Sequence, residues 1–388
     1  MSTSAITPPA APLRFDPSLE QPADDEAETE KELIETLASI SNTTREHTGL
    51  ALRSVHAKGH GVLRGELRML DNVPDVLVQG IFQRLARYPV IVRFSTTPGD
   101  LLDDKVSTPR GMAIKLLGVP GARLPGAESG ADQDFVMVNG PVFTAATPAK
   151  FLSSLKLLAA TTDRAPGLKK VASAALRAAE TIVEAFGTKS ATLTSMGGQR
   201  ETHLLGESFF TQVPLRYGQY VAKLCIAPIS KTLTDLTDKG VDLSDTPDGL
   251  RRSVVDYFAT QDAEWELRVQ LCTDLQEMPI EDASVKWPED LSPYVPIARI
   301  TVPAQPAWSE QAVSVVDQRM SFSPWHGVVD HQPLGGIMRV RRAAYASSAR
   351  LRGAQGSCPF HGAGQSDAPE FAGEAPLNAS PLDMGGAR

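Results

Sequence analysis

Hydrophobic and polar positions follow two different periods along the chain. Between residues 49 and 139, three short runs are rich in β-branched residues and bounded by Gly, Pro and Asp, a pattern typical of strands. These runs are VIVRFST, GMAIKLLG and DFVMVN. Similar runs return later in the chain as SFFTQVPLRYG, YVAKLCIAP, WELRVQLCT and PIARITVP. The pattern therefore predicts two groups of strands.

Apolar residues recur at helical spacing in three other places. EKELIETLASIS predicts a short helix over roughly 30–41, and a block rich in Ala, Leu and Glu predicts helix over about 147–187, interrupted near Pro166. A last helix is expected to begin after PLGG and to continue to about 352. Strands on both sides of a helical insert, without regular βαβ alternation, predict an α+β fold with an antiparallel sheet or barrel.

The ends of the chain differ in composition from its middle. Residues 1–30 are rich in Pro, Ala, Asp and Glu and predict an extended N-terminal arm. Residues 353–388 are rich in Gly, Ala and Pro, a composition typical of flexible tails. The sequence therefore predicts a single domain over residues 31–352, between these two ends.

Composition and charge narrow the functional classes. The 388 residues are 42% hydrophobic and carry a formal net charge of −8, which argues against a broad nucleic-acid surface. The first residues have neither a basic start nor an apolar run, and no stretch has the ~18 apolar residues of a membrane span. The three cysteines form no CxxC pair, and we expect a reducing, cytoplasmic location without stable membrane insertion.

The stretch MRVRRAAYASSARLR, residues 338–352, places five arginines around one tyrosine. On a helix, Arg341, Tyr345, Ser348 and Arg352 share one face. A guanidinium beside a phenol favours the phenolate, and a phenolate oxygen can bind ferric iron. The alternative interpretation is a solvated basic helix that contains an incidental tyrosine.

Two stretches in the first half of the chain could complete such a site. RSVHAKGHG surrounds His56 with small residues, which would let a flat ligand approach, and Arg53 precedes it by three positions. On the strand VIVRFST, Arg93 and Ser95 project to the same face. The serine hydroxyl could fix the imidazole tautomer, and the arginine could hold a carboxylate. The alternative for His56 is a structural histidine, the role that we assign to His60.

A third candidate follows the strand DFVMVN. Asn139 stands at its end, directly before Gly140 and Pro141. An amide in this position is either a turn former or a polar group presented at the edge of the sheet.

Taken together, RSVHAKGHG, VRFSTTPGD, STPRGMAIKLLG, NGPVF and RVRRAAY resemble motifs of the heme catalases, in the same order and with similar spacing. The resemblance spans roughly residues 44–352. SFFTQVPLRYG, RVQLCTDLQEMPIEDASVKWPE and FSPWHGVVDHQPLGGIMRVRRAAY are more similar to the small catalase-like branch, which includes catalase-related peroxidases and allene oxide synthases. This resemblance implies an antiparallel β-barrel with flanking helices around a buried heme b.

The resemblance also implies roles for residues that match its motifs. Tyr345 would be the proximal iron ligand, and Arg341 its hydrogen-bond partner. His56 would be the distal histidine, Ser95 its orienting partner and Asn139 the distal amide.

The remaining matched residues would hold or enclose the heme. Arg53, Arg93 and Arg352 would bind its propionates, whereas Phe143 and Phe151 would line the distal channel.

The implied function is that of a heme peroxidase. It would reduce hydrogen peroxide or organic hydroperoxides through a ferryl intermediate, with a small-molecule reductant, weak catalase activity and a homo-oligomeric assembly. One alternative is an allene oxide synthase-like enzyme that converts fatty-acid hydroperoxides. The other is a heme-binding protein without turnover, to which Cys358 and His361 in the tail could contribute.

Overall fold

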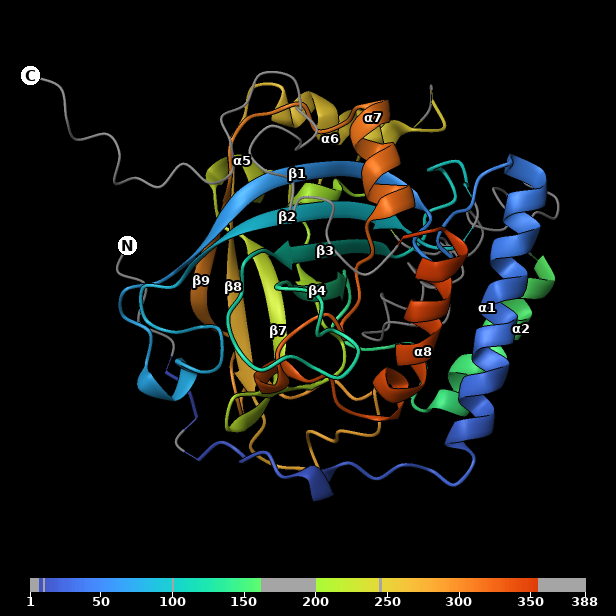
Figure 1. Ribbon diagram of the computed structural model, residues 1–388. Coiled ribbons are helices and arrows are strands. Elements are labelled where there is room, and N and C mark those ends of the chain that lie inside the picture. The colour runs from blue at the N-terminus through green and yellow to red at the C-terminus, as the bar shows by residue number, and fades with distance from the viewer. Residues whose placement is uncertain (1–6, 10, 100, 162–199, 244–245, 355–388) are drawn as a thin grey trace, which may run out of the picture.

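The predicted strands and one that the sequence pattern missed, Lys58–Met69, form one antiparallel sheet that closes on itself (Figure 1). The computed structural model describes residues 7–9, 11–99, 101–161, 200–243 and 246–354. Eight strands pair around the ring in the order β5-β4-β3-β2-β1-β9-β8-β7, a further contact between β5 and β7 closes it, and β6 extends the sheet beyond β7. The expectation of an α+β fold with an antiparallel barrel is therefore confirmed. The strands are β1 Lys58–Met69, β2 Arg87–Thr96, β3 Arg110–Leu116, β4 Gln133–Val138, β5 Phe209–Phe210, β6 Leu215–Tyr217, β7 Tyr220–Pro228, β8 Ala263–Leu271 and β9 Val295–Val302.

Side chains fill the inside of the barrel. Along β8, Trp265, Leu267 and Val269 are fully buried, whereas Glu266 and Arg268 between them are partly exposed. This alternation follows from the two-residue period of a strand. The barrel interior is therefore a packed core, and polar side chains that alternate with the core residues lie on the outside of the barrel.

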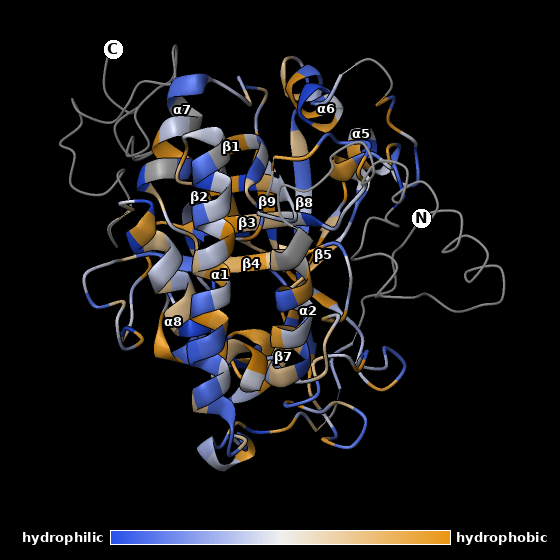
Figure 2. Ribbon diagram, turned by 90° about the vertical axis from the view of Figure 1, so that its right-hand side faces the viewer, coloured by the Kyte–Doolittle hydropathy of each residue, from blue (hydrophilic) through white to orange (hydrophobic). Residues whose placement is uncertain are grey.

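Helices and short turns cover the outside of the barrel. Helices α1, α2 and α8 lie on one side, and Figure 2 views them with α1 between the other two. Apolar side chains join the three, among them Leu37 of α1, Leu152 of α2 and Val340 of α8. The helices are α1 Glu26–Thr48, α2 Pro148–Thr161, α5 Lys231–Thr234, α6 Gly249–Phe258, α7 Glu310–Ser314 and α8 Gly336–Leu351.

The first helix is longer than the sequence pattern predicted. It begins at Glu26 and ends at Thr48, so the extended arm ends earlier than residue 30. Asp25 and Glu26 place negative charge at the start of the helix, which favours a start there. Gly49 ends it with φ of 71°, and its N–H donates to the carbonyl of Arg45.

The other expected helices are only partly within the described residues. Helix α2 covers the start of the predicted block over 147–187, and the part from 162 onward, including Pro166, lies outside the described residues. Helix α8 agrees with the predicted last helix. Of the expected tail, residues 355–388 lie outside the described residues.

The N-terminal arm packs on its own barrel. The N–H of Leu13 donates to the carbonyl of Cys272 over 2.7 Å, and the N–H of Phe15 donates to that of Gln219 over 2.9 Å. Further along, Glu20 pairs with Arg339 of α8. The arm thus connects the residues next to the ends of β7 and β8 to α8, the helix that carries Tyr345.

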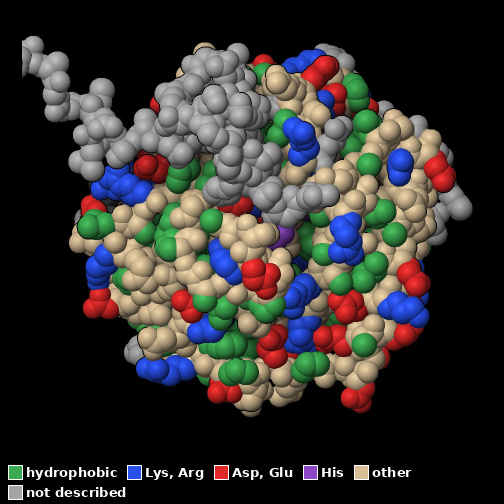
Figure 3. Space-filling model, viewed as in Figure 1, with side chains coloured by type: hydrophobic (Ala, Val, Ile, Leu, Met, Phe, Trp, Pro, Cys, Tyr) green, Lys and Arg blue, Asp and Glu red, His purple; other side chains and the backbone are tan. Residues whose placement is uncertain are grey.

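Two further observations concern the apolar character of the helices and the charge of the surface. In the described part of the chain, none of the helices has the length and apolar character that a membrane span requires. On the face shown in Figure 3, Lys and Arg side chains are interspersed with Asp and Glu.

Candidate active site

Tyr345 and Arg341 lie in contact on α8. Arg341 Nη2 donates to the phenolic oxygen of Tyr345 over 2.6 Å, and the guanidinium also lies over the rings of Tyr345 and Phe143. The four-residue spacing brings the two side chains together within one helical turn. The phenolic oxygen is therefore held by a cation from its own helix.

The other arginines of this helix have different partners. Arg339 pairs with Glu20, Glu26 and Glu281, and Arg342 lies over the ring of Trp325. Thus the helix carries several arginines, but only Arg341 bonds to the tyrosine.

Three arginines from distant segments gather around Asp317. Arg53 Nη1 pairs with Asp317, Arg93 Nε lies 3.1 Å from Asp317 Oδ1, and Arg352 Nη1 donates to the carbonyl of Asp317 over 2.7 Å. The three arginines come from the loop before β1, from β2 and from the end of α8. The side chains of Arg53 and Arg93 are only 12% and 3% exposed, so this cluster is largely buried.

This arginine cluster carries more positive than negative charge. Burial and the neighbouring Arg93 lower the pKa of Arg53 well below its usual value, and burial lowers the pKa of Arg352 to about 10. Burial alone would raise the pKa of Asp317, but the Arg93 and Arg53 guanidiniums outweigh it and lower that pKa. One carboxylate facing three buried cations leaves a surplus of positive charge, which an additional anion would stabilise.

The arginine cluster fits the two propionates of a heme. Three guanidiniums against one carboxylate leave two positive charges, which equals the charge of two carboxylates. Arg352 Nε is also buried without a hydrogen-bond partner in the described residues. The residues present are therefore compatible with the expected heme.

Asp317 is a site residue that the sequence analysis missed. It lies in a π-helical turn, Val315–Arg319, directly after α7. Such turns are rare and often occur at functional sites, but they have no clear signature in a single sequence. The turn also places the carbonyls of Val316 and Met320 where Arg53 Nη2 donates to both, over 2.9 and 3.0 Å.

His56 lies beside the arginine cluster in a strained backbone conformation. Its φ is 55°, which is uncommon for a residue other than glycine and often marks a functional position. Arg93 Nη2 donates to the carbonyls of His56 and Ala57 over 3.1 and 3.3 Å. The same arginine therefore holds both the His56 backbone and Asp317.

The imidazole of His56 packs on the edge of the barrel. Its Nδ1 atom lies 3.2 Å from Ser95 Oγ on β2. Ser95 pairs in register with Gly111 of β3, and a Cβ atom on Gly111 would lie 2.7 Å from the imidazole ring. A side chain at position 111 would displace the ring, so the site requires glycine there.

His56 is neutral over a wide pH range. Burial, and after it the positive charges of Arg93, Arg341 and Arg53, lower the pKa of His56 to about 3. A neutral imidazole has one N–H and one lone pair. If Nδ1–H donates to Ser95, the lone pair is on Nε2, where it can accept a proton.

Asn139 also lies near this edge of the barrel. Its Nδ2 donates to Glu207 Oε2, and its Oδ1 accepts from the backbone N–H of Arg110 over 2.9 Å. Arg110 directly precedes Gly111, which the His56 ring contacts. Glu207 had no signal in the sequence, because 68 residues separate it from Asn139.

The two expected channel residues are in contact with each other. The rings of Phe143 and Phe151 meet edge to face, with centroids 5.0 Å apart. They pack with Val213 and Met338. Phe143 also lies under the Arg341 guanidinium, which connects this pair to the tyrosine side of the site.

Three of the other described histidines have local bonding roles. His60 Nε2 lies 3.0 Å from Thr96 Oγ1, which agrees with the structural role expected for it. His331 Nε2 accepts from the N–H of Ile81 over 3.1 Å, and His326 Nδ1 lies 3.1 Å from Asp134 Oδ2. Cys358 and His361 lie outside the described residues.

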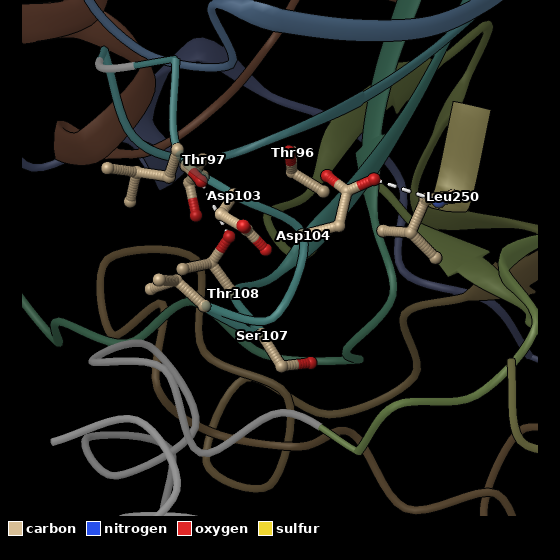
Figure 4. A pocket seen from close by; sticks show the side chains of 9 residues that line it. Thr96, Thr97, Asp103, Asp104, Ser107, Thr108 and Leu250 are labelled. Carbon is tan, nitrogen blue, oxygen red and sulfur yellow. Dashed lines mark hydrogen bonds between the residues drawn. The ribbon is translucent and has the colours of Figure 1, made fainter. Parts of the chain in front are cut away.

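A small polar pocket lies at the end of β2 (Figure 4). It is lined by Thr96, Thr97, Asp103, Asp104 and the chain around Thr108. The N–H of Leu250 donates to Asp104 Oδ2 over 2.8 Å, and Lys58 Nζ lies 2.8 Å from Asp104 Oδ1. Asp104 is thus tied to two neighbouring segments, so we assign the pocket a structural role.

The fold of this chain is that of solved catalases. It is similar to catalase A from Saccharomyces cerevisiae, with a TM-score of 0.57, 17% sequence identity and coverage of 81% of this chain. It is also similar to a fungal catalase, with a TM-score of 0.57, 21% identity and 80% coverage, and to a bacterial catalase, with a TM-score of 0.56, 17% identity and 81% coverage. The chain spans only 64%, 62% and 60% of the lengths of these three proteins.

The sequence adds family evidence to this similarity of fold. Residues 27–174 match the family model described as Catalase. No curated protein matches the chain. Over this part of the chain the sequence is thus similar to the catalase family, and the fold is similar to that of solved catalases.

Proposed function

We propose that the chain binds heme b and acts as a peroxidase on hydrogen peroxide or organic hydroperoxides. The observation that carries the proposal is the 2.6 Å contact between Arg341 and Tyr345 in a chain with the catalase fold. An anionic phenolic oxygen is a suitable ligand for ferric iron. Tyr345 would supply that ligand, and Arg341 would stabilise its negative charge.

Three arginines would fix the orientation of the cofactor. Arg53, Arg93 and Arg352 would each offer a guanidinium to the heme propionates, and Asp317 would keep these groups in place. Arginine suits this role because its planar guanidinium can bind a carboxylate through two hydrogen bonds.

His56, Ser95 and Asn139 would act on the peroxide. When bound, the heme supplies the redox chemistry that cleaves the oxygen–oxygen bond. His56 would accept a proton from the peroxide at Nε2 and return it to the leaving oxygen. Ser95 would keep the imidazole in the required tautomer, and Asn139 would orient the peroxide by donating a hydrogen bond. General acid–base catalysis of this kind contributes typically ~10²–10⁴-fold.

The pair Phe143 and Phe151 favours an organic reductant or hydroperoxide. Two aromatic rings in contact near Arg341 would give the approach to the site an apolar wall. We therefore rank peroxidase activity first and weak catalase activity second. Conversion of fatty-acid hydroperoxides and heme binding without turnover are the remaining alternatives.

One experiment separates these activities. The purified chain is loaded with hemin and mixed under anaerobic conditions with hydrogen peroxide or, separately, with a fatty-acid hydroperoxide, each with and without an oxidisable dye. Rapid dye oxidation with little oxygen release supports the peroxidase. Oxygen release without dye indicates a catalase, consumption of fatty-acid hydroperoxide alone indicates the converting enzyme, and heme binding without any turnover contradicts an enzymatic role.

The proposal includes a cytoplasmic location and a homo-oligomeric state. Cys225 and Cys272 are both buried and free, which suits a reducing compartment. Sedimentation of the purified chain tests the oligomeric state.

A further inference from the structure

Glu207 is an unassigned carboxylate at the edge of the proposed site. It lies between a short turn, Leu204–Gly206, and β5, and its side chain is 13% exposed. Its Oε1 atom accepts from Arg110 Nη1 and from Thr202 Oγ1, the latter over 2.7 Å. Its Oε2 atom accepts from Asn139 Nδ2. Both carboxylate oxygens therefore accept hydrogen bonds, and one of them accepts from Asn139, the amide proposed to contact the peroxide.

The bonding partners define the orientation of the Asn139 amide. A carboxylate only accepts hydrogen bonds, so the atom that faces Glu207 is the NH₂ group. A backbone N–H only donates, so the atom that faces Arg110 N at 2.9 Å is the oxygen. The amide is planar, and one N–H of its NH₂ group remains after the bond to Glu207. The direction of that N–H is thus fixed by Glu207 and Arg110 together.

Arg110 connects this amide to the proposed distal histidine. Its side chain is 1% exposed, and its Nη2 donates to the carbonyl of Arg200 over 2.6 Å. Its backbone exchanges hydrogen bonds with Asn139, and the next residue, Gly111, contacts the His56 ring. Glu207 therefore holds Asn139 and also Arg110, the residue that directly precedes Gly111.

We propose that Glu207 is a positioning residue, which orients Asn139 so that its remaining N–H is directed to a ligand on the His56 side of the heme. This inference rests on the proposed function. It predicts that Glu207 acts through Asn139, without contacting the peroxide itself.

The test compares Glu207→Gln, Asn139→Ala and the double variant, each loaded with hemin. Cyanide binding to the ferric protein is the main measurement, because cyanide accepts a hydrogen bond on the distal side without turnover. We expect each single variant to bind cyanide roughly two- to tenfold more weakly, the range of one hydrogen bond, and kcat/KM for peroxide to fall similarly. The double variant should lose no more than Asn139→Ala alone, because residues that act as one unit are not additive.

A matched control is Glu266→Gln. Glu266 is a partly exposed carboxylate of β8 that pairs with Arg268 at 2.8 Å, and it lies outside the site. It should leave cyanide affinity unchanged. Where Glu207→Gln does not fold, Glu207→Asp keeps the charge near Arg110 but withdraws the carboxylate from Asn139, and the same losses are expected.

Unchanged cyanide affinity in the Glu207 variants, or additive losses in the double variant, overturns the inference. A wild-type chain that binds hemin and turns over peroxide while the Glu207 variants behave as wild type contradicts only this inference. A wild-type chain without hemin binding or turnover contradicts the proposed function, and the inference with it.

Discussion

Arg341 Nη2 lies 2.6 Å from the phenolic oxygen of Tyr345, one helical turn away on α8. This contact places the permanent positive charge of a guanidinium beside the oxygen proposed to bind iron. The guanidinium thus donates a charge-assisted hydrogen bond to that oxygen.

The first prediction concerns Tyr345. We expect Tyr345→Phe, loaded with hemin, to lack the absorption bands of ferric tyrosinate and to lose peroxide turnover, because phenylalanine has no oxygen to bind iron. Absorption spectroscopy of the loaded protein is the measurement. Tyr257→Phe is the control, since Tyr257 bonds to Thr232 outside the site. Retention of the tyrosinate bands in Tyr345→Phe contradicts the assignment of the ligand.

The second prediction concerns His56. We expect His56→Gln to retain heme but to lose peroxide turnover by about 10²–10⁴-fold, the usual contribution of general acid–base catalysis. Stopped-flow kinetics with hydrogen peroxide measures the loss, and heme content is measured on the same samples. Ser95→Ala should lose less, because it keeps the imidazole. Wild-type rates in His56→Gln show that another group moves the proton.

The third prediction concerns pH. Because the pKa of His56 is lowered to about 3, its imidazole is neutral above that pH and charged only below it. Activity that requires the neutral base should therefore persist as the pH falls from 8 to about 4.5, without a step near the ordinary histidine pKa of about 6.5. The measurement is kcat/KM for peroxide across this range. A step near 6.5 that disappears in His56→Gln contradicts the prediction.

The fourth prediction concerns Asp317. In Asp317→Asn, the largely buried Arg53 and Arg93 lose the carboxylate with which they pair, whereas Arg352 keeps its bond to the backbone carbonyl. We expect the apo chain to lose about 3–5 kcal/mol of unfolding free energy, the usual cost of removing one partner from a buried ion pair. Hemin should then raise the melting temperature more in the variant than in wild type, because its carboxylates replace the missing charge.

Urea unfolding of the apo chain and thermal melting with hemin are the two measurements for Asp317. Asp330→Asn is the control, since Asp330 pairs with Arg216 at 3.3 Å near the surface. Equal hemin effects on wild type and Asp317→Asn show that the arginine cluster does not bind the cofactor.

The fifth prediction concerns His331, which is 1% exposed. Burial lowers its pKa to about 3, so between about 6.5 and 3 the unfolded chain binds one proton more than the folded chain at this position. The stability that neutral His331 contributes is complete above pH 6.5 and is lost as the pH falls toward 3. We expect unfolding free energy to fall more steeply in wild type than in His331→Gln, by about 1.4 kcal/mol per pH unit.

Urea unfolding at pH 7, 6 and 5 measures this slope for both chains. Glutamine keeps an acceptor for the N–H of Ile81 but has no proton to gain. Identical slopes for the two chains show that His331 takes up no proton on unfolding.

Several features of the site were evident from the sequence because they depend on neighbours in the chain. Arg341 and Tyr345 meet because a helix brings residues four apart onto one face. Arg93 and Ser95 share a side of β2 because strand side chains alternate, while Phe94 between them packs in the barrel core. The two periods also predicted most of the strands and the last helix. The sequence pattern predicted the ends of these elements less well, as the earlier start of α1 shows.

The tertiary structure alone decided which distant groups meet. Asp317 pairs with Arg53 across 264 residues, and Glu207 reaches Asn139 and Arg110 only because β4 and β5 become neighbours in the barrel. Gly111 is required because the His56 ring lies on it, which no local pattern reveals. The sequence by itself determined elements and the pairs within them, since those depend on a fixed repeat of 3.6 or two residues. Barrel closure and the π-helical turn determined the charges around the site, because such contacts form only when separate segments pack together.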